Sequence, residues 1–104
     1  MNEDYFKSIK TYEHLLNLIP LDHSVYYNLG RAYIKYGEYD KAIDALENAI
    51  KLDSNYVPAW NLLGASYFGK GDYDRSIEAF KNFVNIDPTD HVAWYNLAEA
   101  LFAT

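Results

Sequence analysis

The chain repeats itself every 34 residues, and this period limits its fold more than any other feature of the sequence. When residues 23–56 are aligned with residues 57–90, ten positions are identical. These positions include Leu29 and Leu63, Gly30 and Gly64, Tyr33 and Tyr67, and Asp53 and Asp87. Residues 91–104 restart the unit, and residues 3–22 match its second half. A fixed period of this length indicates stacked supersecondary units that bury one continuous core between them.

Each unit has the pattern of two helices. In residues 57–70 the apolar residues Trp60, Leu63 and Tyr67 recur at spacings of three and four, as on one face of a helix. Gly37 and Gly71 lie between the two halves, where a helix end favours a left-handed residue. We expect one all-α domain over 1–104, with six helices near residues 4–18, 22–36, 39–52, 56–70, 73–86 and 90–102.

The helix ends have their own signals. Asp22 and Asp90 are predicted N-caps, because an aspartate side chain accepts hydrogen bonds from the free N–H groups of a first turn. Pro58 fits a first turn, where its missing N–H removes no helical hydrogen bond. The repeated Gly30 and Gly64 predict close contact between the two helices of a hairpin.

The unit resembles the tetratricopeptide repeat, whose pattern is W-x2-L-G-x2-Y, then A-x3-F, then P. The second full unit matches it with Trp60, Leu63, Gly64, Tyr67, Ser76, Phe80 and Pro88. The first full unit has Tyr26, Leu29, Gly30, Tyr33, Ala42 and Leu46, with Ser54 where proline is usual. The resemblance covers nearly the whole chain, as a half repeat (3–22), two full repeats (23–56 and 57–90) and a second half repeat (91–104).

The resemblance implies a right-handed α-solenoid of antiparallel helical hairpins whose first helices line a concave groove. In this family such a groove holds an extended peptide or a short helix. The family positions place these residues in the groove: Tyr27, Asn28, Arg31, Lys35, Asn61, Phe68, Tyr95, Asn96 and Glu99. The expected partner is therefore a protein or peptide.

Two groups of groove residues allow a functional interpretation and a plainer one. Asn28 and Asn96 share a repeat position, and an asparagine amide can pair with the C=O and N–H groups of an extended backbone. Glycosyltransferase relatives bind substrate chains through such asparagines, although here Leu62 interrupts the series. The alternative is that these asparagines are solvated surface residues.

Arg31 and Lys35, four residues apart, could bind an acidic side chain or a C-terminal carboxylate, or could belong to an ordinary solvated face. The chaperone-binding branch of the family has basic residues where this chain has Val92 and Asn96. The resemblance therefore predicts no specific capture of the acidic tails of the large chaperones.

The period also shows that the chain begins on a second helix and stops on a first helix. Both end helices carry apolar residues with little polar cover, and we expect them to form two complementary surfaces. These residues are Tyr5, Ile9, Tyr12 and Leu16 at one end, and Trp94, Leu97, Leu101 and Phe102 at the other. The chain is either an excised or engineered segment of a longer array, or a structural module that forms a homo-oligomer through these ends.

Composition and motifs exclude several other classes of function. The net charge of −6 disfavours binding to nucleic acid or to anionic lipid, which both require clustered Lys and Arg. There is no cysteine, no Gly-rich phosphate loop and no zinc-protease motif, so we expect no enzyme, no cofactor and no metal site. No signal peptide and no transmembrane segment is recognisable, which favours a cytoplasmic protein.

Overall fold

The structure, a computed structural model, describes residues 3–19 and 21–104. The described residues form these helices and no strand: α1 (Glu3–Leu18), α2 (His23–Lys35), α3 (Tyr39–Leu52), α4 (Val57–Lys70), α5 (Tyr73–Ile86) and α6 (His91–Ala103). The predicted bounds of α3 and α5 are confirmed, and the other helices differ from the prediction by one residue at one or both ends.

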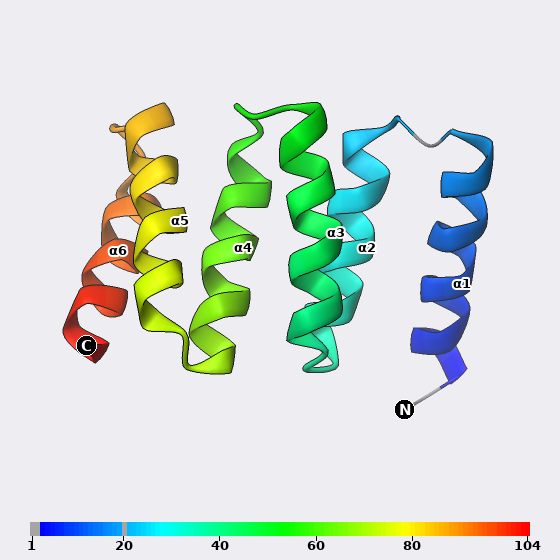
Figure 1. Cartoon of the computed structure of the whole chain (residues 1–104), viewed down its shortest axis with the longest axis horizontal. Coiled ribbons are helices and arrows are strands. Elements are labelled where there is room, and N and C mark those ends of the chain that lie inside the picture. Colours follow the sequence, from blue (N-terminus) through cyan, green and yellow to red (C-terminus); the bar gives the residue numbers. More distant parts are fainter. Residues whose placement is uncertain (1–2, 20) are drawn as a thin grey trace.

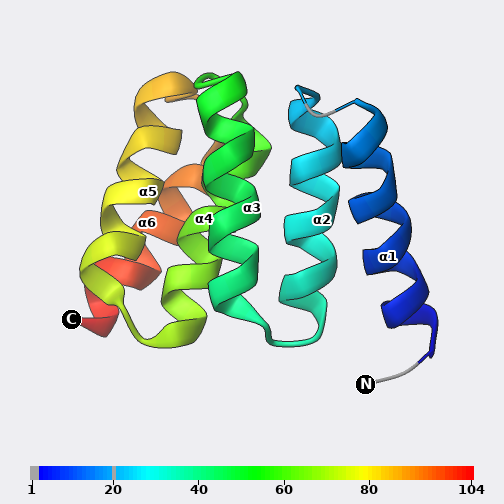
Figure 2. The same ribbon diagram turned by 45° about the vertical axis from the view of Figure 1, so that its right-hand side comes forward.

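The helices stack side by side from α1 to α6 in a right-handed α-solenoid (Figure 1). Each helix contacts the next one along the chain, and α2 also contacts α4. In Figure 1 α2 lies behind α3 and α6 lies behind α5, and in Figure 2 α4 also lies behind α3. The array measures 38 × 28 × 19 Å. It therefore has one face made mainly by first helices and one made mainly by second helices.

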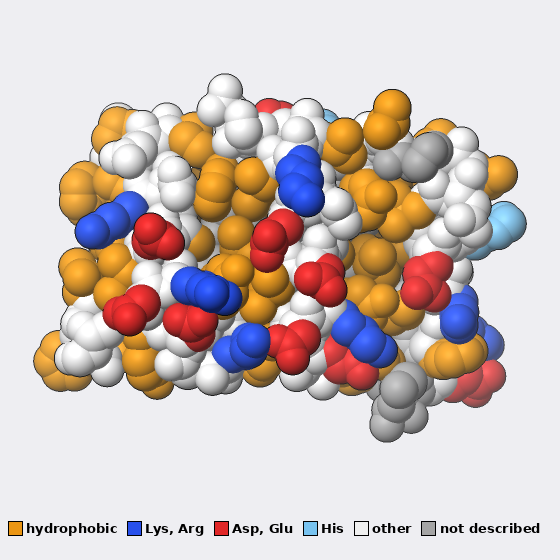
Figure 3. All heavy atoms as spheres, viewed as in Figure 1, with side chains coloured by type: hydrophobic (Ala, Val, Ile, Leu, Met, Phe, Trp, Pro, Cys, Tyr) orange, Lys and Arg blue, Asp and Glu red, His pale blue; other side chains and the backbone are white. Residues whose placement is uncertain are grey.

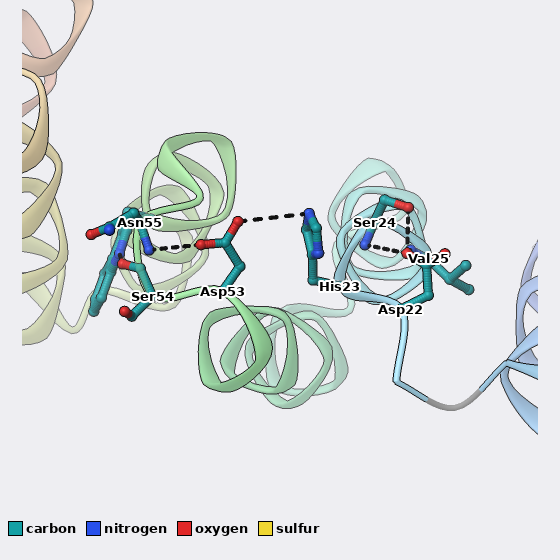
Figure 4. Close-up of polar contacts among 8 residues, drawn as sticks. Asp22, His23, Ser24, Val25, Asp53, Ser54 and Asn55 are labelled. Atoms are coloured by element: carbon teal, nitrogen blue, oxygen red, sulfur yellow. Dashed lines mark hydrogen bonds and ion pairs between the residues drawn. The ribbon is translucent and has the colours of Figure 1, made fainter.

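The predicted helix ends are present. Gly37 and Gly71 have φ angles of 77° and 85°, which a glycine adopts without a steric penalty. An Asp22 oxygen accepts hydrogen bonds from the Ser24 N–H at 2.8 Å and the Ser24 hydroxyl at 2.6 Å (Figure 4). Asp90 caps α6 in the same way, through the N–H of Val92 at 2.9 Å. These local signals begin and end the helices where the repeat requires it.

Gly30 and Gly64 lie where the two helices of a hairpin are closest. A Cβ atom on Gly64 would lie 2.5 Å from the Phe80 ring, and one on Gly30 would lie 2.7 Å from Leu46. The buried Ser76 hydroxyl also donates a hydrogen bond to the Gly64 carbonyl at 2.8 Å, which ties α5 to α4. The close approach predicted from the repeated glycines is therefore confirmed.

The core runs along the array in two connected clusters. The larger cluster spans α1 to α5 and includes Ala42, Leu46 and Ala49, all at 0% exposure. The smaller cluster joins α5 and α6 through Phe80, Phe83 and Leu97, among others, and Trp60 packs against both clusters. Because each hairpin shares its core with its neighbours, the packing of the array determines which side of each helix is buried and which is exposed.

Candidate functional site

All nine residues predicted for the groove lie on the first helices α2, α4 and α6, and each is half-buried or exposed. They do not form one continuous hollow. Asn28, Arg31 and Lys35 line a cavity between α1 and α2, and Phe68, Tyr95, Asn96 and Glu99 line cavities beside α4 and α6, whereas Tyr27 and Asn61 line none of these. The candidate site is thus a face with a hollow at each end.

The cavity between α1 and α2, called here the α1–α2 pocket, has a volume of about 430 Å³. Its lining combines four residues of α2 with two of α1, namely Asn28, Arg31, Ala32 and Lys35 with Ser8 and Tyr12. Sequence reasoning placed Tyr12 at an association surface and did not connect Ser8 with the groove. The helical spacing gave no signal for this, because the contribution of α1 depends on how α1 packs on α2.

The cations of this pocket are held by aromatic rings rather than by carboxylates. The Arg31 guanidinium lies 6.0 Å from the centre of the Tyr27 ring, and the Lys35 ammonium lies 5.7 Å from that of Tyr36. The Tyr27 ring meets the edge of Tyr56 at 5.4 Å. Within the described residues neither cation forms an ion pair, so their charge is available to a ligand.

The cavity at the other end, called here the α4–α6 pocket, has a volume of about 420 Å³. It is lined mainly by apolar and aromatic groups, with Phe68 from α4 and Tyr95 and Phe102 from α6. Glu99 adds one acidic group and accepts a hydrogen bond from the Tyr95 hydroxyl at 3.0 Å. That hydrogen bond raises the pKa of Tyr95. This pocket suits an apolar side chain.

The asparagines of the site occupy different surroundings. The Asn96 amide donates to the side-chain oxygen of Asn61 at 2.8 Å, which links α6 to α4. Asn28 instead lines the α1–α2 pocket beside Arg31. Asn61 and Asn96 thus form a pair on one side of Leu62, and Asn28 stands alone on the other side. Asn28 and Asn96 are therefore not equivalent for a ligand.

Three of the residues predicted for exposed end surfaces are in fact buried. Tyr5 and Ile9 are 4% and 8% exposed because they face the core from α1, and Leu97 is 9% exposed within the α5–α6 cluster. The expectation that they form exposed surfaces is wrong, because their side chains pack into the two core clusters. Tyr12 and Leu16 are half-buried against the core. Trp94, Leu101 and Phe102 are 51%, 49% and 92% exposed, as an end surface requires.

The opposite face carries a cavity that the sequence did not indicate. It has a volume of about 440 Å³ and lies between α3 and α5, with Trp60, Leu63 and Tyr67 of α4 in its lining. Two acids and two bases, Glu47, Glu78, Lys51 and Arg75, also line it. Figure 3 shows this face, where apolar side chains lie between acidic and basic ones. Its balanced charges give no preference for an anion or a cation.

The histidines do not gather into a metal site. His23 Nε2 lies 3.9 Å from an Asp53 carboxylate oxygen at the start of α2, and the Asp53 side chain also accepts from the Asn55 N–H at 3.1 Å (Figure 4). No group of three or more potential metal ligands occurs in residues 3–19 and 21–104. No helix in these ranges has the length and apolar character that crossing a membrane requires.

Comparison with known proteins places the chain among helical repeat proteins. The description "Tetratricopeptide repeat" matches residues 11–44 and 57–90, and "TPR repeat" matches residues 30–71, so the three matches together extend from residue 11 to residue 90. No curated protein shows a significant match to the chain.

Solved structures share the whole architecture. The TPR domain of Sgt2 from Aspergillus fumigatus is 25% identical, with a TM-score of 0.88 over 96% of this chain and 68% of that one. A MamA structure is 30% identical, with a TM-score of 0.90 over 95% of this chain, which spans about half (54%) of MamA.

The first TPR domain of Spaghetti, bound to an HSP90 peptide, reaches a TM-score of 0.91 over 96% of this chain and 79% of that one. At 19% identity it supports the fold alone. The repeat matches, the hairpin geometry and these structures agree, and the chain belongs to the tetratricopeptide repeat family.

Proposed function

We propose that the chain is a non-catalytic scaffold that binds a segment of a partner protein along its first-helix face. The observation that carries the proposal is the pair of cavities at the two ends of this face, the α1–α2 pocket and the α4–α6 pocket. The first has two basic residues in its lining, and the second is lined mainly by apolar and aromatic residues. A peptide that spans both would bury side chains of two kinds, which gives orientation as well as affinity.

The comparisons support this proposal at the level of the family. The first TPR domain of Spaghetti is described as bound to an HSP90 peptide, and the second TPR domain of human RPAP3 as in complex with an HSP70 peptide. Both are under 25% identical to this chain, so neither identifies its partner. They support peptide binding by domains of this fold.

The test is a selection of peptides from a random displayed library, followed by titration of the selected peptides. We expect the double variant Asn28→Ala/Asn96→Ala to weaken binding more than the control Asn48→Ala/Asn82→Ala, which changes two second-helix asparagines. Each lost amide hydrogen bond should weaken binding about five- to tenfold. Equal effects of the two double variants would count against the first-helix face.

A second titration tests the chaperone prediction. The peptide SRMEEVD, bound by the Spaghetti domain, is compared with a scrambled peptide of the same composition. We expect no preference between them, since Val92 and Asn96 supply no positive charge on α6. A clear preference for the native order would contradict this prediction.

A second candidate function is self-association through α6. The exposed side chains of Trp94, Leu101 and Phe102 favour it, because they form an apolar surface with little polar cover. Light scattering across a range of concentrations tests it, with Leu101→Glu as the variant that should abolish association. A protein that stays monomeric at high concentration would exclude this candidate.

A further inference from the structure

The α1–α2 pocket concentrates positive charge in a chain that is otherwise acidic. The chain has 9 Lys and Arg residues against 15 Asp and Glu residues, yet two of the nine line this one pocket and no acidic residue does. Arg31 and Lys35 lie about one helical turn apart, and Asn28 lies one turn before Arg31. Lys7, Lys10 and Lys70 each lie beside a carboxylate, whereas neither Arg31 nor Lys35 forms an ion pair within the described residues. The cavity between α3 and α5 and the one between α1 and α3 also hold two cations each, but acidic residues line them too, whereas none lines the α1–α2 pocket.

The residues that line the α1–α2 pocket have counterparts 34 residues later in the chain, and these are of a different kind. They are small or apolar residues, namely Ala42, Leu46, Leu62, Ala65, Ser66 and Gly69. The helix α2 packs against them, with Gly30 directly over Leu46. The equivalent place beside α1 carries Arg31 and Lys35 instead, so an apolar helix docked there would bury two unpaired charges. Burial of an unpaired charge is strongly unfavourable, which points to an anionic occupant.

We propose that the α1–α2 pocket binds an acidic side chain, Asp or Glu, of the partner peptide. This inference rests on the proposed function and specifies the peptide that the first-helix face prefers. The planar Arg31 guanidinium can donate two parallel hydrogen bonds to a carboxylate, and Lys35 adds a second charge. Asn28, Ser8 and Tyr12 supply further donors from both sides of the hollow.

On this proposal the two pockets bind two different kinds of side chain. The acidic side chain lies at α1–α2, and an apolar or aromatic side chain occupies the α4–α6 pocket against Phe68 and Phe102. Glu99 in that second pocket repels a second acid, which sets the direction of the peptide along the array. The preferred ligand is thus an amphipathic peptide with its acidic and apolar residues at opposite ends.

The test uses three labelled probe peptides of ten residues. The acidic probe has two leucines, a Gly-Ser spacer and two glutamates, and carries a C-terminal amide. The neutral probe has glutamine for both glutamates. A third probe has glutamine and a free C-terminal carboxylate. Fluorescence anisotropy at low ionic strength measures their binding to the wild-type chain.

We expect the acidic probe to bind about tenfold more tightly than the neutral probe, which corresponds to 1.4 kcal/mol. Arg31→Gln and Lys35→Gln should each remove most of that difference. The matched control is Lys81→Gln, an exposed lysine on α5 that lines none of these pockets. Arg31 and Lys35 are exposed, so both variants should keep the helical circular dichroism of the wild type.

Several outcomes would overturn the inference. Equal binding of the acidic and neutral probes would refute an acid-binding pocket, but it would not contradict peptide binding on the first-helix face. An equal effect of Lys81→Gln would reduce the result to general electrostatics. Tighter binding of the free-carboxylate probe than of the acidic probe would assign the pocket to chain termini. Concentration-dependent association abolished by Glu99→Gln would assign it to a second copy of the chain.

Discussion

The contact between Gly64 and Phe80 gives the most direct test of the packing. The ideal Cβ of an alanine at position 64 would lie 2.5 to 2.7 Å from three atoms of the Phe80 ring. Phe80 is 4% exposed within the α5–α6 cluster, so the ring has little free space into which it can move. Gly64→Ala therefore forces α4 and α5 apart or turns the ring away from its place.

Two effects of opposite sign decide the magnitude. Replacing glycine with alanine inside a helix stabilises it by about 1 kcal/mol. Overpacking of a well-filled core costs about 1–3 kcal/mol. We expect the cost of overpacking to exceed the gain in helix propensity. The net result is a loss of about 1 kcal/mol in the free energy of unfolding and a fall in Tm of roughly 4–8 °C. The larger Gly64→Leu should lose more.

The control is provided by the same repeat position one unit later, where Ala98 is exposed. Ala98→Gly adds no atom that could clash and should lose about 1 kcal/mol through helix propensity. Urea denaturation followed by circular dichroism measures each variant.

A double-mutant cycle with Phe80→Leu isolates the contact. In that background Gly64→Ala should be less destabilising by about 1 kcal/mol, because the ring atoms that it meets are gone. An increase in stability from Gly64→Ala alone, or an equal effect in both backgrounds, would refute the close-contact reasoning.

Three further predictions concern single side chains. Burial and the nearby Glu47 raise the pKa of Tyr67 in the folded chain. The contribution of Tyr67 to the free energy of unfolding is therefore fully present below the unfolded tyrosine pKa of about 10 and is lost as the pH rises above it. Tyr67→Phe should flatten the decline in the free energy of unfolding that denaturation measures from about pH 9 upward. Hydrogen bonds from Ser24 lower the pKa of Asp22, so its contribution is present above about pH 4 and is lost as the pH falls through the lowered pKa; Asp22→Asn should make the acid side of the Tm profile less steep. Phe102 is 92% exposed, so Phe102→Ser should change the free energy of unfolding by less than about 0.5 kcal/mol while reducing any self-association seen by light scattering.

The fold was predictable because its signals are local and repeated. Several helix ends have their own marker, such as Asp22, Gly37 or Gly71, and the period sets the order of the helices. Contacts between elements were less visible. Gly69 lies against the Tyr39 ring, where an added Cβ would be 2.5 Å away, yet it has no glycine counterpart in the other units.

The candidate site was predictable only in part, for the same reason. Family positions identified Arg31 and Lys35, because both lie on one first helix. The α1 wall of their pocket, with Ser8 and Tyr12, depends on the packing of two helices. The burial of Tyr5 and Ile9 similarly follows from how closely α1 lies on its neighbours, which helical periodicity does not specify.

The two tryptophans offer a built-in optical probe of the array. Each indole N–H donates to a carbonyl six residues earlier, Trp60 to Ser54 at 2.8 Å and Trp94 to Pro88 at 2.7 Å. Their local tethers match, but Trp60 is half-buried between the two core clusters while Trp94 is 51% exposed on α6. The emission of Trp60 therefore reports the central junction, and that of Trp94 reports the terminal helix. Single-tryptophan variants would reveal whether the array unfolds as one unit or frays from its ends, without any added label.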